Sequence, residues 1–242
     1  MTVVAIIPSR LGSTRLAEKA LLRDTGKVLV QHVWERVRAA RSIGRVIVAT
    51  DHERIAAAVA SFGGEVAMTS PDHPSGTDRV AEVARGLDAE WFVNVQGDEP
   101  EIDPADLDLL VGALAQERDC GIATLATPFR SDADLALPSA VKVVLDGAGR
   151  ALYFSRSAIP HGAKAGDPTL APLKHRGVYA FRRATLLAVA ALPVAPLEQV
   201  ERLEQLRWLH HGQRLRVVIT PRDGLGIDTL ADYRRFVDGS VR

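Results

Sequence analysis

Three positive charges follow the first apolar segment of the chain, and their spacing suits a polyphosphate ligand. Residues 3–7 are apolar, and the loop after them carries Arg10, Arg15 and Lys19 beside glycine and small hydroxyl residues. A loop of this kind at the end of a strand presents backbone N–H groups and fixed positive charge to phosphates. We therefore predict a nucleotide site here, and a solvated basic turn is the alternative.

Two aspartates are candidates for binding Mg²⁺ against those phosphates. Asp98 lies in the segment Gln-Gly-Asp-Glu-Pro at 96–100, which follows a predicted strand at 91–95. Mg²⁺ on a triphosphate takes one or two protein carboxylates, so a second aspartate is needed, and Asp228 is the candidate. The alternatives are that Asp98 belongs only to a turn and that Asp228 only caps a helix beginning near Thr229.

A third polar segment, His-Pro-Ser-Gly-Thr-Asp-Arg at 73–79, follows another predicted strand. Ser75 and Gly76 can approach a ligand closely and hydrogen-bond to it, and Arg79 can reach a base or a phosphate. The alternative is an ordinary loop in which a residue at 77–78 caps the next helix.

Several other chemistries lack their motifs in this chain. The sequence contains no GxxxxGK[ST], GxGxxG or GxSxG pattern, and its single cysteine, Cys120, has no partner for a disulfide or a cysteine metal site. Lys plus Arg and Asp plus Glu both number 30, so the formal net charge is zero and no global basic field indicates nucleic acid or an anionic membrane. An anionic ligand must therefore be held locally.

The alternation of apolar segments predicts an α/β fold that places these loops at one edge of a sheet. In the first half, strand-like and helix-like segments alternate, as in a doubly wound sheet with mostly parallel strands. The predicted strands are 3–7, 46–50, 65–68 and 91–95, and the predicted helices are 30–40, 53–62, 77–86 and 104–116. Ligands bind at the carboxyl ends of the strands in such sheets.

After Gly121 the pattern changes to short strands separated by turn-rich segments. We predict strands at 122–127, 141–145, 151–155, 178–181 and 215–220, with helices at 197–210 and 228–236. This predicts a smaller mixed-sheet extension. The chain is then a single domain, 1–242, with one half at about 1–120 and the other at about 121–242.

These motifs, taken together and in this order, resemble those of the sugar nucleotidyltransferases, most closely the 3-deoxy-manno-octulosonate (Kdo) cytidylyltransferase family. That family has a first loop of the form Pro-x-Arg-x-x-Ser-Thr-Arg-Leu-Pro-x-Lys-Pro-Leu, followed by segments similar to 73–79 and 96–100. The chain departs from this pattern at Ala17 and Ala20, where the family usually has proline. Proline would stiffen the loop, so the departure concerns its rigidity and not its charges.

The resemblance implies a Rossmann-like fold of the nucleotide-diphospho-sugar transferase type and assigns roles to the residues of the first half. Asp98 and Asp228 are implied as Mg²⁺ ligands, and Arg15 and Lys19 as neutralising the charge that grows on the leaving group. The nucleotide-binding set is implied to be Pro8, Arg10, Ser75, Gly76, Arg79 and Gln96.

The acid sugar needs its own pocket, for which the second half offers three segments. Arg156 suits bidentate carboxylate binding. By resemblance, His175 and Tyr179 match the family's His-x-Gly-x-Tyr, and its Leu-Glu-Gln-Leu-Arg segment directs Glu204 and Gln205 at sugar hydroxyls. From the charge pattern alone, the predicted helix carrying the last two is a solvated surface helix, whose core face would be Leu197, Val200, Leu203 and Leu206.

The function implied by the resemblance is transfer of CMP from CTP to Kdo, with Mg²⁺ as cofactor, for lipopolysaccharide biosynthesis. We expect a cytoplasmic location, because the N-terminal apolar segment is too short for a signal peptide and no segment reaches transmembrane length. The family also implies a homodimer, with the second half binding the sugar acid and forming the dimer. Other possibilities are a transferase for another acid sugar such as 8-amino-Kdo, a transferase using another base, and a catalytically silent nucleotide-binding regulator.

Overall fold

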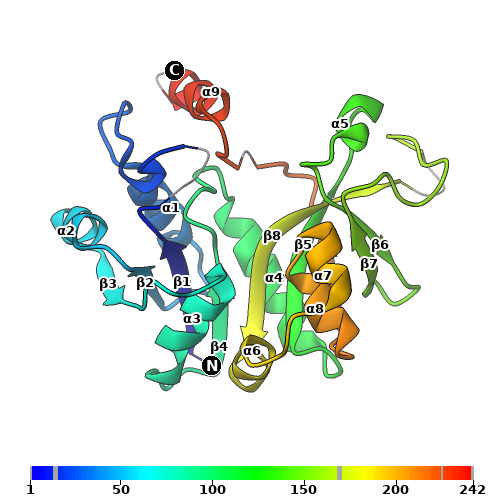
Figure 1. Ribbon diagram of the computed structural model, residues 1–242, viewed down its shortest axis with the longest axis horizontal. Helices are drawn as coiled ribbons and strands as arrows, with labels where there is room; N and C mark the ends of the chain where they lie inside the picture. Colours follow the sequence, from blue (N-terminus) through cyan, green and yellow to red (C-terminus); the bar gives the residue numbers. More distant parts are fainter. Residues whose placement is uncertain (1, 13–15, 168–170, 225, 241–242) are drawn as a thin grey trace. The chain divides into compact units, whose positions relative to one another are not determined.

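The chain folds into two units, which a computed structural model describes at residues 2–12, 16–167, 171–224 and 226–240 (Figure 1). The first unit comprises Met1–Asp108 together with Gly224–Arg242, and the second comprises Leu109–Asp223. The sequence predicts a boundary near residue 120 and assigns the whole C-terminal segment to the second half. The structure corrects this assignment, because residues 224–242 belong to the first unit.

The sheet of the first unit is parallel, with the strand order β3-β2-β1-β4. Its strands are β1 (Val3–Ser9), β2 (Arg45–Thr50), β3 (Glu65–Met68) and β4 (Trp91–Asn94). Every residue of β1 and β4 is buried, as expected for parallel strands covered on both faces. Ser9 pairs in register with Thr50, so the strand ends that carry the predicted motifs lie at one edge.

Helices follow each of these strands at the positions that the sequence predicts to within two residues. They are α1 (Leu29–Arg38), α2 (Glu53–Ser61), α3 (Gly76–Arg85) and α4 (Pro104–Gln116), with a short 3-10 helix, η1 (Lys19–Leu21), in the first loop. Right-handed crossovers through helices are the usual way to join parallel strands. α4 begins in the first unit and ends in the second.

The C-terminal helix α9 (Leu230–Ser240) packs within the first unit, although it is far from it in sequence (Figure 1). Tyr233 and Phe236 of α9 form a buried cluster with Ile227 and with Leu29 of α1. The Tyr233 hydroxyl also accepts a hydrogen bond of 2.9 Å from the backbone N–H of Asp24. These contacts are the physical reason that the C-terminal segment does not belong to the second half.

The second unit has a mixed sheet. β5 (Ile122–Pro128) pairs antiparallel with β8 (Leu173–Arg182) and parallel with β9 (Leu215–Ile219), while β6 (Lys142–Leu145) pairs antiparallel with β7 (Ala151–Ser155) and β8. Its helices are α5 (Asp132–Ala136), α6 (Arg183–Ala190), α7 (Pro196–Glu201) and α8 (Gln205–His210).

The prediction of one helix over 197–210 is wrong, because the chain turns between α7 and α8. Arg202, the residue after α7, has φ 53° and ψ 48°, a left-handed conformation that ends an α-helix. Leu203 and Leu206 are buried as the pattern predicts, whereas Leu197 and Val200 are 43% and 82% exposed.

None of the helices in the described part of the chain is both long and apolar enough to span a bilayer.

Candidate active site

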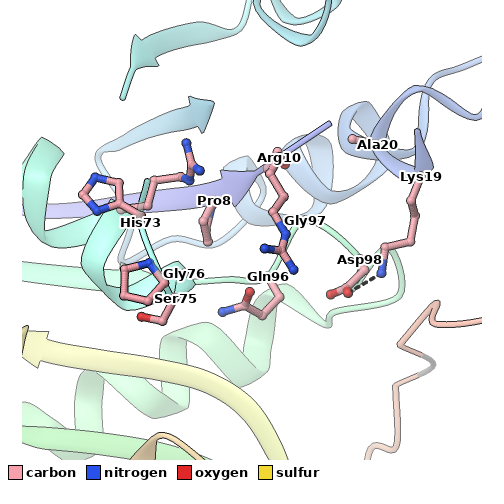
Figure 2. A pocket seen from close by; sticks show the side chains of 13 residues that line it. Pro8, Arg10, Lys19, Ala20, His73, Ser75, Gly76, Gln96, Gly97 and Asp98 are labelled. Carbon is pink, nitrogen blue, oxygen red and sulfur yellow. Dashed lines mark hydrogen bonds and ion pairs between the residues drawn. The ribbon is translucent and has the colours of Figure 1, made fainter. Parts of the chain in front are cut away.

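The carboxyl-terminal edge of the first unit's sheet contains a pocket of about 220 Å³ (Figure 2). The loops after β1, β3 and β4 supply its walls, as expected for an open α/β sheet. Eight of the residues predicted from the sequence line it, namely Pro8, Arg10, Lys19, Ser75, Gly76, Arg79, Gln96 and Asp98.

Lys19 is the charged centre of this pocket. Its ammonium donates to Asp98 Oδ2 at 2.6 Å (Figure 2). It also donates to the backbone carbonyl of Ile227 at 2.6 Å. Asp228 Oδ1 lies 3.7 Å from the same nitrogen. The Lys19 ammonium therefore pairs with the carboxylates of both Asp98 and Asp228, which are far apart in the sequence.

Asp228 is not the cap of α9. Thr229 and Asp232 exchange hydrogen bonds at the start of that helix, from the Asp232 N–H to Thr229 Oγ1 at 3.2 Å and from the Thr229 N–H to the Asp232 carboxylate at 2.9 Å. This is the reciprocal arrangement of a capping box. The Asp228 carboxylate pairs with Lys19, so the alternative that Asp228 serves only as a helix cap is wrong.

The two aspartates fit the demand of a triphosphate-bound Mg²⁺. No three His, Cys, Asp or Glu side chains in the described ranges form a preformed metal cluster. Mg²⁺ in nucleotide sites does not need one, because phosphate and water oxygens complete its shell. Asp98 and Asp228 supply two hard carboxylate donors, which is the share of the shell that a protein contributes to a nucleotide-bound Mg²⁺, and both carboxylates lie beside the Lys19 ammonium.

The loop before α3 approaches the end of β4 closely. Ser75 caps α3, because its Oγ accepts from the Asp78 N–H at 3.2 Å, so the cap is not at 77–78. A Cβ on Gly76 would lie 3.2 Å from Gln96 Oε1 and 3.3 Å from a ring carbon of Pro8. Glycine at position 76 therefore lets two walls of the pocket meet.

Arg79 lines the pocket with its guanidinium already paired. It is 3% exposed, and it donates to Asp51 Oδ2 at 2.8 Å and to the Thr69 hydroxyl. Sequence reasoning missed Asp51. The signal was present, because Asp51 directly follows β2, as Asp98 follows β4 by a few residues.

His73 also lines the pocket, although the sequence assigns it no individual role. Its Nε2 pairs with the Glu82 carboxylate, which also accepts from the Ser70 N–H at 3.1 Å. The His73 hydrogen bond is the largest cause that lowers the pKa of Glu82. Arg15, predicted as catalytic, lies outside the described residues.

In the second unit, His175 and Tyr179 of β8 belong to one aromatic cluster. The ring of His175 lies 4.8 Å from that of Phe154 and 5.6 Å from that of Tyr179, and its Nε2 is 2.9 Å from Thr124 Oγ1. Burial lowers the pKa of His175 to about 3, so its imidazole is neutral at ordinary pH. Burial and the nearby Glu204 charge raise the pKa of Tyr179 well above its usual value, which keeps its hydroxyl protonated.

Gln205 has a buried amide nitrogen without a partner among the described residues. The residue is 4% exposed, and the nitrogen concerned is Nε2. Buried amide N–H groups almost always donate to an acceptor, so we expect this nitrogen to donate to a ligand or to a water molecule. Glu204 precedes it at the start of α8, and its charge acts on Tyr179.

Arg156 lies near the turn that carries these residues. Its guanidinium donates to the backbone carbonyls of Glu201, Pro138 and Arg202 at 2.8, 3.0 and 3.3 Å. A guanidinium has five N–H donors, so at most two remain for a ligand carboxylate.

An α/β unit of parallel strands with Lys, Asp and Arg side chains in a pocket at the strand ends is the arrangement in which open α/β sheets bind anionic ligands such as nucleotides. A cytidylyltransferase family profile matches residues 4–215 of the chain. The chain is 46% identical to the 3-deoxy-manno-octulosonate cytidylyltransferase of Syntrophotalea carbinolica, covering 97% of both proteins, and 48% identical to that of Syntrophobacter fumaroxidans, covering 98% of the chain and 96% of the relative.

A solved structure of CMP:2-keto-3-deoxy-manno-octonic acid synthetase complexed with CTP has the same fold. It superposes with a TM-score of 0.93 at 40% identity, covering 100% of this chain and 99% of that one. This confirms the predicted fold class, an α/β fold with a mostly parallel mixed sheet and a smaller extension. The chain belongs to the cytidylyltransferase family and, within it, to the 3-deoxy-manno-octulosonate cytidylyltransferases.

Proposed function

We propose that this chain activates Kdo by the reaction CTP + Kdo → CMP-Kdo + pyrophosphate. The anomeric 2-hydroxyl oxygen of Kdo forms a bond to the α-phosphorus while the bond to the β-phosphate oxygen breaks. Pyrophosphate leaves with that electron pair, and the hydroxyl proton passes to solvent. The observation that carries the proposal is the convergence of Asp98 and Asp228 on Lys19 in the pocket of the first unit.

The first unit's residues then act mainly by position and charge. Lys19 and Arg15 neutralise the charge that grows on the leaving pyrophosphate, and Arg10 holds the nucleotide phosphates. Asp98 and Asp228 would hold Mg²⁺, which would neutralise phosphate charge and lower the pKa of the attacking hydroxyl. Pro8, Ser75, Gly76, Arg79 and Gln96 shape the nucleotide pocket, and the pairing of Arg79 with Asp51 supports a role in holding that wall.

The second unit's residues bind the acid sugar in this proposal. Gln205 gives its buried, unsatisfied amide to a sugar oxygen, and Glu204 accepts from hydroxyl groups. His175 and Tyr179 act as neutral hydrogen-bonding groups, as the direction of both pKa shifts supports. Arg156 meets the sugar carboxylate with the N–H groups that the backbone does not use.

The proposal extends to the assembly and its location. We infer a homodimer formed through the second unit, since α7 and the residue before its cap expose Val194, Leu197 and Val200. We infer a cytoplasmic enzyme of lipopolysaccharide biosynthesis, because CTP is a cytoplasmic nucleotide.

Pyrophosphate release tests the function directly. The purified chain is assayed with CTP, UTP, GTP and ATP against Kdo, 8-amino-Kdo and other sugar acids, with Mg²⁺ and with chelator. We expect turnover with CTP and Kdo that requires Mg²⁺. Turnover only with another sugar acid would show that Kdo is not the substrate, and turnover only with another nucleotide would show that the base is not cytosine. Nucleotide binding without any turnover would indicate a catalytically silent regulator.

A further inference from the structure

Lys142 is a fully buried lysine of the second unit whose ammonium is held by backbone carbonyls. The residue lies in β6 and is 0% exposed, and its Nζ donates to the carbonyls of Leu137 and Arg156, each at 2.7 Å. Burial and the neighbouring Arg156 charge lower the pKa of Lys142, while the Glu201 charge opposes this. A buried cation is costly, so its retention on two carbonyls indicates that those carbonyls must be held in place.

The Glu201 carboxylate gathers donors from the end of β7. Ser155 Oγ donates to its Oε1 at 2.6 Å, and the backbone N–H of Arg156 donates to its Oε2 at 2.8 Å. Burial raises the pKa of Tyr153, and so does the Glu201 carboxylate, which accepts from the Tyr153 hydroxyl. Both carboxylate oxygens of Glu201 are therefore occupied as acceptors.

Arg156 is hydrogen-bonded to both Lys142 and Glu201. Lys142 holds its carbonyl and Glu201 holds its N–H, while its guanidinium donates to the carbonyls of Glu201 and Arg202. Arg202 is the left-handed residue that separates α7 from α8, and Gln205 begins α8 soon after it. The segment between the two helices is thus fixed from a strand that is distant in the sequence.

We propose that Lys142 and Glu201 are positioning residues for the acid sugar: through Arg156 and the left-handed Arg202 they set the positions of Glu204 and Gln205. This inference rests on the proposed function and deepens it. It assigns no substrate contact to Lys142 or Glu201 themselves.

Three substitutions can each remove part of the hydrogen bonding around Arg156 with little change in side-chain size. Glu201→Gln keeps the shape but converts one acceptor oxygen into an NH₂ group, which then faces a donor from Ser155 or Arg156. Lys142→Met keeps the length of the side chain and removes the ammonium donor from the carbonyls of Leu137 and Arg156. The Leu137 carbonyl keeps the Ala140 N–H at 3.2 Å as a donor. Ser155→Ala removes one donor to Glu201 and the acceptor of the Ser157 N–H, and it leaves the bond from the Arg156 N–H to Glu201 in place, so it is the mildest of the three changes.

Steady-state kinetics with CTP and Kdo separates positioning from general damage. We expect Glu201→Gln and Lys142→Met to lower kcat/KM for Kdo by about ten- to a hundredfold, mainly through KM, because displacement of binding groups by about 1 Å has effects of this size. Ser155→Ala should give a smaller change in the same direction. KM for CTP should stay within about twofold of wild type in all three.

The controls are Gln199→Ala, an exposed position on the same helix, and Lys27→Met, an exposed lysine of the first unit. Both should leave kinetics for Kdo and CTP at the wild-type level. Thermal unfolding is measured for every variant. Equal losses for CTP and Kdo, or a lowered melting temperature with unchanged Kdo kinetics, would overturn the inference.

If Glu201→Gln and Lys142→Met do not fold, Ser155→Ala tests the positioning role through the same comparison of KM for Kdo with KM for CTP. A raised KM for Kdo supports the role, and an unchanged one contradicts it. Failure of the proposed function is seen separately, because it requires that the wild-type chain shows no turnover with CTP and Kdo. Wild-type turnover together with an unchanged KM for Kdo in the variants contradicts only the positioning role.

Discussion

Asp98 is the residue whose removal best tests the nucleotide chemistry. It is held by the Lys19 ammonium, and its backbone carbonyl accepts from the Ile227 N–H at 2.8 Å. The backbone bond survives a change of side chain, so Asp98→Asn should preserve the fold of the pocket. We expect Asp98→Asn to lower kcat with CTP and Kdo by about 10³-fold, because a neutral amide cannot replace a carboxylate that holds Mg²⁺. The measurement is pyrophosphate release over a range of Mg²⁺ concentrations.

The matched control is Asp88→Asn, a change of the same kind at an exposed position of the first unit. It should retain the wild-type rate. If Asp98→Asn kept full Mg²⁺-dependent activity, the metal assignment would be wrong.

His175 makes a prediction about stability and pH. Its pKa is about 3 in the folded chain and 6.5 when exposed, so between these values the unfolded chain binds a proton that the folded chain does not. The free energy of unfolding must therefore fall as pH falls below about 6.5. From pH 7 to pH 5 this single group accounts for a loss of about 2 kcal/mol, at up to about 1.4 kcal/mol per pH unit.

Urea unfolding of wild type and His175→Gln at both pH values measures this loss. The variant should be less stable at pH 7, since it disturbs the contact with Thr124, but it should lose less stability on acidification. His161→Gln, at an exposed histidine, should follow the wild-type curve. Equal pH dependence in wild type and His175→Gln would contradict the buried neutral imidazole.

Among the structural elements, the first loop carries alanine at the two positions, 17 and 20, where the resemblance implies proline. Ala17 and Ala20 flank Glu18, whose φ is 50°, and Ala20 lies within the short helix η1. In the described part of this loop the N–H groups of Leu21 and Leu22 donate to backbone carbonyls, and proline at 17 or 20 would remove neither bond. The first turn of a helix also tolerates proline.

Restoring both prolines should lower KM for CTP by roughly two- to fivefold, which corresponds to about 0.4–1 kcal/mol of chain entropy. The readout is initial velocity against CTP concentration for Ala17→Pro/Ala20→Pro. The opposite change, Ala17→Gly/Ala20→Gly, is the matched control and should raise KM. An unchanged or higher KM in the proline variant would show that stiffness of this loop does not limit nucleotide binding.

The elements also show what local sequence can and cannot predict. In the first unit the bounds of β1–β4 and α1–α4 follow from periodicity and caps to within two residues, and β3 is found at 65–68 as predicted. α9 runs from Leu230 to Ser240, whereas the predicted helix spans 228–236, and η1 is not predicted. α5 was missed, although Ser131 caps it by accepting from the Asp134 N–H, a signal that the sequence contains. The break at Arg202 carries no local signal, because arginine rarely adopts positive φ and the bonds that hold its carbonyl come from Arg156.

At the scale of the whole molecule, the return of the C-terminal segment follows only in part from the sequence. Assigning Asp228 to the site of Asp98 already requires residues near 228 to lie in the first unit, yet the predicted halves place them in the second. In the structure, residues 224–242 belong to the first unit, as the assignment of Asp228 requires. The buried cluster of Tyr233, Phe236 and Leu29 holds them there. Such packing between distant segments has no signature in a single amphipathic helix.

The exposed apolar face of α7 leads to a prediction about assembly. The spacing of Leu197 and Val200 predicts burial, but both are exposed in the single chain, Val200 by 82%. Covering a valine of this kind stabilises an interface by about 1.5–3 kcal/mol, and a twofold axis uses each such residue twice. A charge at this position would instead be buried without a partner.

We therefore expect Val200→Glu to shift the chain from dimer to monomer at micromolar concentration, as measured by light scattering after size-exclusion chromatography. Gln199→Glu adds the same charge to the neighbouring, exposed residue of α7 and should remain dimeric. A dimeric Val200→Glu variant would place the interface elsewhere, and a monomeric wild-type chain would refute the dimer. Because Val200 adjoins Glu201, measuring KM for Kdo in the Val200→Glu monomer also shows whether dimer formation supports the cluster that holds Arg202.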